Sequence, residues 1–165
     1  MKQSLLHRLL SVGLALVLLG GCGAKPTQEE LARQLLEQVY TVPAGQEEPD
    51  EASLREQYAD AFTAQGYEKA LANRTLTTLP KLAASYGIAI QPQQVVLTPP
   101  QGGIGHWQFS VTAQCTPQEG EAVTVTFPGA LTFSETEEDK VELLVLDGPG
   151  DLHEQMQQAG VEPQQ

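Results

Sequence analysis

The spacing of hydrophobic residues changes once along the chain and divides it into a helical part and an extended part. Between Thr27 and Gly87, apolar residues recur every three or four positions, as they do on one face of an α-helix. After Gly87 they alternate with polar residues, as in a strand with one buried face. The pattern therefore predicts helices first and an antiparallel sheet second.

Capping and breaker residues predict where the first helix lies. Thr27 and Glu30 have the spacing of a capping box, and the apolar stripe that follows predicts a helix over residues 28–40. Residues 43–51 are acidic and rich in helix breakers, which is typical of a linker. The domain is therefore expected to begin with a packed helix.

The next helices are bounded by glycine and proline. Ser53 with Glu56 predicts the start of a second helix that ends at Gly66. Helical spacing continues over residues 67–74 and, after a threonine-rich stretch, over residues 78–87. The second stretch has a proline in its first turn and a glycine at its end, so we expect a kinked pair of helices.

The extended part contains four predicted strands. Trp107, Phe109 and Cys115 point to one face of the second strand, whereas His106 and Gln108 point to the other. We therefore expect a sheet with one buried face and one face in water. The strands cover residues 88–98, 106–116, 123–133 and 141–146.

Three local features refine this sheet. Residues 141–146 are apolar on both faces, which predicts a central strand covered by helices. Pro128 and Gly129 predict a bulge or bend in the third strand. Asp151 favours the start of one more short helix within the C-terminal tail, residues 149–165.

The order of elements places residues 27–148 in the α+β class as a single domain. Residues 106–111 (HWQFSV), followed by residues 129–133 (GALTF), resemble the nuclear transport factor two-like, or cystatin-like, cone fold of many small bacterial lipoproteins. The resemblance implies N-terminal helices packed on a curved antiparallel four-stranded sheet. The usual members also place a helix between strands, which this pattern lacks, so another helix-plus-meander arrangement stays open.

The first 21 residues have the parts of a bacterial lipoprotein signal peptide. Lys2 and Arg8 give a cationic start, residues 9–19 are apolar, and residues 19–22 (LGGC) resemble a lipobox. A helix over residues 9–19 spans about 16 Å, much less than the ~30 Å apolar core of a bilayer. We therefore do not expect this stretch to cross a membrane permanently.

The lipobox resemblance implies cleavage between Gly21 and Cys22 and a covalent diacylglycerol on the Cys22 thiol, with a further N-acyl chain in many bacteria. Residues 22–26 are then a lipidated tether that holds the domain on the extracytoplasmic side of the cell membrane. The alternatives are an ordinary cleaved signal peptide with an incidental cysteine and a short uncleaved anchor. No other cofactor is expected.

Charge and cysteine content exclude some partners. Without its leader the chain has 144 residues, with 7 basic and 21 acidic side chains, a formal charge of −14. Such a body is repelled by nucleic acid and by anionic lipid headgroups, so we expect no nucleic-acid binding and an attachment that depends on lipid. Cys115 is the only other cysteine, which leaves no internal disulfide and predicts a buried thiol.

The sequence carries no motif of a known active site. Metal-ligand spacings, a phosphate-binding loop and a nucleophile elbow are all missing from it. We therefore expect no catalytic residue and no metal. The sequence favours a non-catalytic domain that binds a protein, a peptide or a small apolar ligand, with His106 and Trp107 as the candidate binding surface.

The alternative function is an isomerase-like or hydrolytic enzyme. Enzymes with the cone fold use an Asp or His that projects into the cavity, beside a tyrosine. The candidates here are Asp60, Asp139, Asp147 and His106. An enzymatic function would require such a side chain to be buried in a pocket. A solute-binding subunit of an importer is disfavoured, since 144 residues cannot form the usual two lobes.

Overall fold

The computed structural model describes residues 25–100, 105–158 and 160–163, so the leader, Cys22 and the proposed cleavage site lie outside the described residues. Its elements, in chain order, are α1 (Gln28–Val39), α2 (Glu51–Tyr58), the 3-10 helix η1 (Ala59–Ala61), α3 (Ala64–Ala72), α4 (Thr78–Tyr86), β1 (Ile88–Thr98), β2 (His106–Pro117), β3 (Val123–Phe133), β4 (Val141–Leu146) and α5 (Pro149–Gln158). The predicted α+β class, with helices followed by an antiparallel four-stranded sheet, is confirmed.

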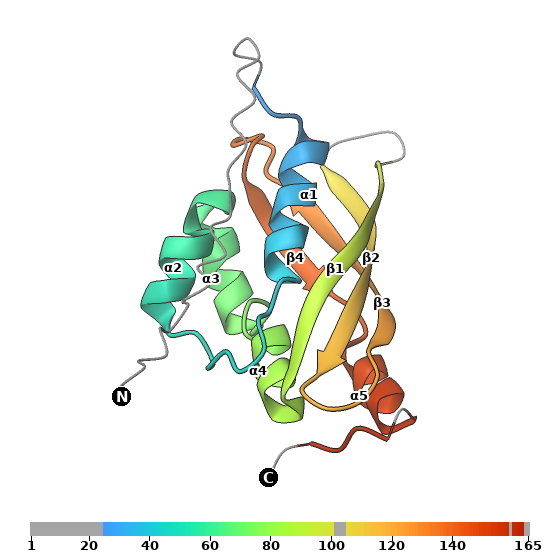
Figure 1. The fold of residues 1–165 in the computed structure, drawn as a ribbon. Helices are drawn as coiled ribbons and strands as arrows, with labels where there is room; N and C mark the ends of the chain where they lie inside the picture. The colour runs from blue at the N-terminus through green and yellow to red at the C-terminus, as the bar shows by residue number, and fades with distance from the viewer. Residues whose placement is uncertain (1–24, 101–104, 159, 164–165) are drawn as a thin grey trace, which may run out of the picture.

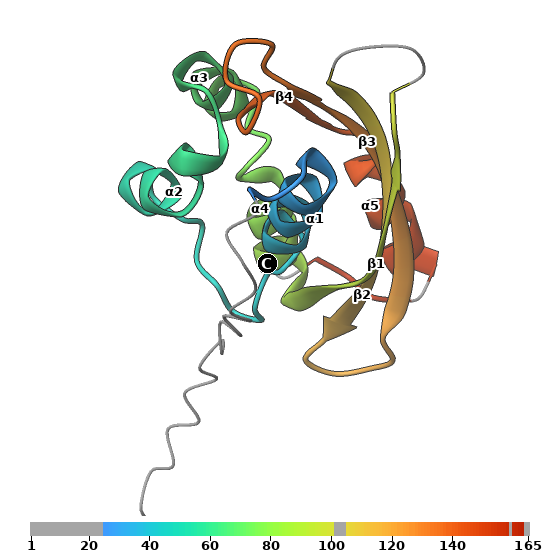
Figure 2. The ribbon, with the colours of Figure 1, turned by 90° about the horizontal axis from the view of Figure 1, so that it is seen from above.

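The four strands form one open antiparallel meander in the order β1-β2-β3-β4. The sheet curves, and α1 and α4 lie on its concave side, while α2 and α3 lie toward the β4 edge (Figures 1 and 2). This arrangement is consistent with a cone-like fold. The predicted capping box at the start of α1 is also confirmed, because the Thr27 hydroxyl and the Glu30 carboxylate each accept from the backbone N–H of the other residue.

The centre of the concave face is filled by aromatic side chains. Tyr40, which follows α1, packs on the rings of Phe109 and Phe127 at centroid distances of 6.5 and 5.3 Å. All three side chains are buried. The α1 residues Leu35 and Leu36 are buried in the same cluster, so the helix and the sheet share one core.

The C-terminal helix α5 joins this core. Its Leu152 and Met156 are fully buried in the same hydrophobic cluster as the concave face of the sheet. The helix contacts β3 and α4, and the Tyr86 hydroxyl of α4 is hydrogen-bonded to His153 Nδ1. A short helix in the tail was expected from Asp151, and the packed unit extends through it.

The predicted central position of residues 141–146 is wrong, because β4 is an edge strand. Its apolar residues have another explanation, since the free edge of β4 is covered by α3 and by the residues just before and after this helix. The backbone N–H of Thr63 donates to Val141 O at 3.0 Å, and the Thr75 hydroxyl donates to Leu144 O at 3.5 Å. Periodicity alone does not separate a strand between two strands from a strand covered by a helix.

The second helix begins earlier and ends earlier than predicted. Its N-cap is Asp50, whose side chain accepts from the Ser53 N–H at 2.8 Å, so Ser53 is not the cap. The helix ends at Tyr58, and Gly66 does not stop it but lies inside α3. Gly66 is buried against β4, where a Cβ would lie 2.5 Å from Val141 O. The glycine permits a close approach of helix to strand instead of terminating a helix.

Strand β3 runs through Pro128 and Gly129 without the predicted bulge. The register shifts instead at Pro92/Gln94 in β1 and at Thr132/Phe133 in β3. Gly129 is required for another reason, because a Cβ there would lie 2.2 Å from the ring of Phe109. The missing side chain leaves room for the ring that fills the concave face.

We predict that Gly66→Ala lowers the free energy of unfolding by about 1–3 kcal/mol, because the added methyl forces α3 away from the backbone of β4. Urea unfolding measures the loss. Gly150→Ala in α5 is the matched control, since a Cβ at that position meets no atom within 4 Å. Equal stability of the two variants would contradict the close docking of α3 on β4.

Candidate functional site

The two residues of the predicted binding surface do not share a surface. His106 is exposed on the outer face of the sheet, where its Nδ1 lies 3.0 Å from the Thr132 hydroxyl. Trp107 is half-buried and packs against the core from the concave side. Neighbouring strand residues point to opposite faces, so this pair cannot bind one ligand between them.

Two of the carboxylates considered for catalysis lie at the rim of a hollow between α1 and the β4 side of the sheet, whose floor includes Leu35 and Phe133. Asp60 and Asp139 line this small hollow of about 270 Å³ together with Lys25 and Lys140. Asp139 forms an ion pair with Lys25 at 3.7 Å, and the Lys140 ammonium donates to the backbone carbonyl of Asp60. The first contact joins the residues before α1 to the β3–β4 turn, and the second joins the same turn to η1.

The remaining candidates lie apart from this hollow. Asp147 is exposed after β4, and its backbone N–H donates to Pro128 O at 2.9 Å. Cys115 is buried on the concave face, as the sequence predicted. Burial raises the pKa of its thiol to about 11, so the thiol stays protonated and is a poor nucleophile near neutral pH.

A groove of about 810 Å³ lies between α1 and the edge strand β1, and we call it the glutamine groove. One wall is the outward side of α1, the other is the central part of β1, and Gln57 of α2 closes one side. Six of its ten lining residues are glutamines. The lining consists of Gln34, Glu37, Gln38, Thr41, Gln57, Gln91, Pro92, Gln93, Gln94 and Val95.

A register shift in β1 shapes the groove. Between Pro92 and Gln94 the strand contains one residue, Gln93, without a partner in β2, and an extra residue of this kind bends a strand and redirects side chains. Pro92 is acceptable here because β1 is an edge strand and needs no N–H donor on its free side. The shift brings three glutamines to the groove within four residues of chain.

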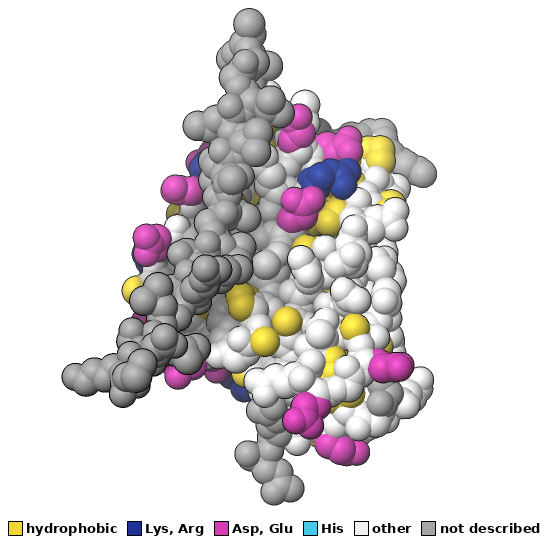
Figure 3. Space-filling view, viewed as in Figure 1, with side chains coloured by type: hydrophobic (Ala, Val, Ile, Leu, Met, Phe, Trp, Pro, Cys, Tyr) yellow, Lys and Arg dark blue, Asp and Glu magenta, His cyan; other side chains and the backbone are white. Residues whose placement is uncertain are grey.

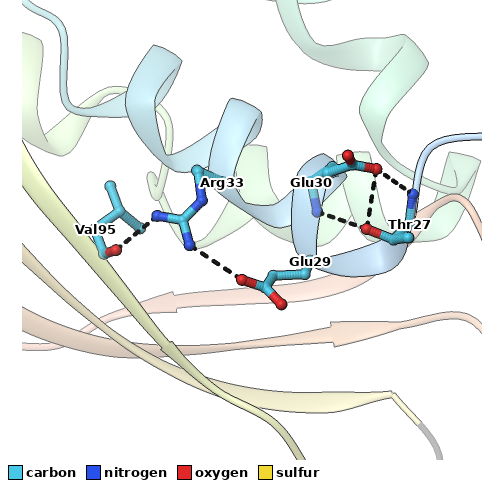
Figure 4. A network of polar contacts seen from close by, with 5 residues as sticks. All are labelled: Thr27, Glu29, Glu30, Arg33 and Val95. Carbon is cyan, nitrogen blue, oxygen red and sulfur yellow. Dashed lines mark hydrogen bonds and ion pairs between the residues drawn. The ribbon is translucent and has the colours of Figure 1, made fainter. Parts of the chain in front are cut away.

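The two ends of this free edge are held by α1 and the residues after it. At one end, Val42 pairs with Ile90 through two backbone hydrogen bonds of 2.9 and 2.8 Å. At the other end, the Arg33 guanidinium donates to Val95 O at 2.7 Å and to Glu29 Oε1 at 3.2 Å (Figure 4). The groove therefore has fixed walls.

The chemistry of the groove is that of neutral amides. Each glutamine side chain offers two N–H donors and a carbonyl acceptor. Gln38 donates to Gln57 O at 3.4 Å, whereas among the described residues no protein partner is found for the amides of Gln34, Gln93 and Gln94. Glu37 is the one charged residue of the lining. The surface over β1 is largely uncharged, whereas acidic and basic side chains gather over the start of α1 (Figure 3).

The sequence contained a signal for this groove that periodicity does not detect. Residues 91–94 read QPQQ, a polar interruption with a proline in an otherwise alternating strand. Such an interruption indicates a bulge on an edge strand. The partner wall on α1 could not be assigned without the docking angle of the helix.

Comparisons with known proteins give no family for this chain: no family model matches it, and neither a curated protein nor a solved structure does. Among the described residues, no helix is long and apolar enough to cross a membrane. The same part of the chain contains no group of three or more His, Cys, Asp or Glu side chains placed to hold a metal ion.

Proposed function

We propose that this protein is a bacterial lipoprotein, anchored to the extracytoplasmic side of the cell membrane through Cys22, whose domain binds ligand without catalysis. The lipobox-like residues 19–22, after a cationic start and a short apolar stretch, support the anchor. The domain starts at the Thr27 cap, five residues after Cys22. Two acyl chains on one sulfur are enough to hold a protein firmly at a membrane.

The glutamine groove is the site proposed for the ligand, and its lining supports an extended peptide segment. The wall from Gln34 to Thr41 is about 10 Å long at 1.5 Å per residue, which matches three or four extended residues. Glutamine amides can pair with both the N–H and the C=O groups of a peptide backbone. A small apolar ligand is a poorer fit, because it would remove these amides from water without replacing their hydrogen bonds.

Charge restricts the peptide further. Glu37 lies in the groove, and the body that surrounds it carries a formal charge of −14 after cleavage of the leader. An acidic segment is repelled by this field, whereas a neutral or basic one is not. The groove also lacks an aromatic platform among its lining residues, which disfavours a glycan that stacks on aromatic rings.

The enzymatic alternative has less support. His106 and Asp147 are exposed, and Asp60 and Asp139 line only the small hollow described above, beside Lys25 and Lys140. The centre of the concave face is occupied by Tyr40 and its aromatic neighbours. A catalytic carboxylate or imidazole of a cone requires a cavity around it.

The lipid anchor predicts that cells expressing this chain incorporate labelled fatty acid into the wild-type protein and not into Cys22→Ser. The thioether to diacylglycerol needs the sulfur, so the serine variant cannot be modified. Metabolic labelling followed by gel analysis measures the incorporation, with Cys115→Ser as the control that keeps its label. Equal labelling of wild type and Cys22→Ser would refute the anchor.

The peptide-binding proposal predicts that the capped tetrapeptide Ala-Ala-Lys-Ala shifts the NMR signals of the groove amides, with a Kd of about 1 mM. The capped Ala-Ala-Glu-Ala peptide should shift them much less, because the acidic groove repels it. A variant with Gln34→Ala and Gln93→Ala should bind about tenfold more weakly, whereas Gln65→Ala on α3 should bind as wild type. Shifts with an N-acetylglucosamine tetramer alone, or with no probe, would contradict the proposal.

A further inference from the structure

The outer face of the sheet is uncharged, in contrast with the rest of the molecule. The register places partner residues on a common face, such as Gln94, Thr112 and Thr126 in one row and Val96, Ser110 and Pro128 in the next. None of the residues that point outward from the four strands is Asp, Glu, Lys or Arg. The chain as a whole has 30 charged residues, so this face is strongly depleted in charge.

Glu142 of β4 does not break this pattern. It is the residue added by the register shift opposite Thr132 and Phe133, and its carboxylate lies 3.7 Å from Lys69 of α3. Its side chain is therefore directed to the helix at the edge of the sheet instead of the outer face.

Two exposed apolar side chains mark the same face. The large hydrophobic residues that the described structure leaves exposed are Val96 of β1 and Val145 of β4, at 48% and 39% exposure. Both point outward, and the rows between them contain Pro128 and Ala130. The other outward side chains are mostly Thr, Ser and Gln, so the feature that this face shares with an interface core is its depletion of charge.

We propose that the outer face of the sheet is the contact between two copies of this chain. Two such strongly acidic bodies repel each other wherever carboxylates face carboxylates. The outer face is where two copies can meet without such pairs. A basic partner, in contrast, finds no electrostatic attraction on this uncharged face and is attracted to the acidic helices and turns instead. Two sheets packed face to face with aligned strands are a common arrangement.

The geometry of the strands fits two copies attached to the same membrane. The tether residue Lys25 contacts Asp139 in the β3–β4 turn, and this turn lies at the same end of the sheet as the start of β2 (Figure 1). Two sheets packed with their strands in the same direction keep both tethers at one end. This point rests on the proposed anchor, whereas the charge and exposure arguments do not.

The size of the face predicts a weak dimer. Strands of 11 or 12 residues, spaced about 4.8 Å apart with a rise of about 3.3 Å, give a face of about 500 Å² per copy. The total of about 1,000 Å² lies at the lower limit for a specific interface. Attachment to one membrane raises the effective concentration and compensates for a weak contact.

The test is disulfide crosslinking of the full-length protein in expressing cells. With the oxidant copper phenanthroline, Thr112→Cys and Thr126→Cys are each expected to give a non-reduced band at twice the monomer mass. Gln65→Cys, exposed on α3, and the parent chain are the controls, and neither should give that band. Adding Ser110→Glu to Thr112→Cys should lower the crosslinked fraction about fivefold or more, since it places like charges opposite each other.

No doubled band with either cysteine variant would overturn the proposal, and so would equal crosslinking of Gln65→Cys. A band at another mass would show a different partner and would also overturn it. A second experiment separates this proposal from the anchor. Thr112→Cys and Thr126→Cys are each combined with Cys22→Ser, purified in detergent and crosslinked. A dimer that persists there at high concentration supports the outer-face contact even if Cys22 carries no lipid.

Discussion

The packing of Tyr40 against Phe109 and Phe127 is the contact on which the rest of this structure depends. It places the end of α1 at the centre of the concave face, and therefore sets the distance between α1 and β1. Gly129 makes room for the Phe109 ring, so the aromatic group reaches across β3 instead of resting above it. Because side chains occupy the position where a cone-like fold can hold a ligand, binding is expected at the groove outside the sheet edge.

Both edges of the sheet are protected, which restricts how the domain can meet a partner. The β4 edge is covered by the start of α3, whose Gly66 permits backbone contact with Val141. The β1 edge is held by Val42 and Arg33, and between them Pro92 removes a donor. Proline, bulges and covering segments are the usual ways to prevent strand addition at an edge. The protected edges leave the glutamine groove and the outer face open as binding surfaces.

Much of the fold could be predicted from the sequence, because periodicity and caps are local signals. The Thr27 capping box, the change of period at Gly87 and the buried side of β2 were all predicted correctly. The position of β4 was not, since apolar residues on both faces fit either a central strand or an edge strand covered by a helix. Gly66 and Gly129 were assigned to a helix stop and a bulge, although each serves a tertiary contact. The groove has two walls that are far apart in sequence, and only their docking reveals it.

The concave face is a packed core, and ligands are expected to bind outside it. Xenon enters apolar cavities without needing polar partners, so NMR under xenon pressure tests this claim most directly. We expect that xenon does not shift the ring signals of Tyr40, Phe109 and Phe127 in the wild-type protein. Phe127→Ala, which opens a cavity at the same place, should show a saturable shift. A saturable shift of these rings in the wild type would show an open cavity on the concave face and contradict the account.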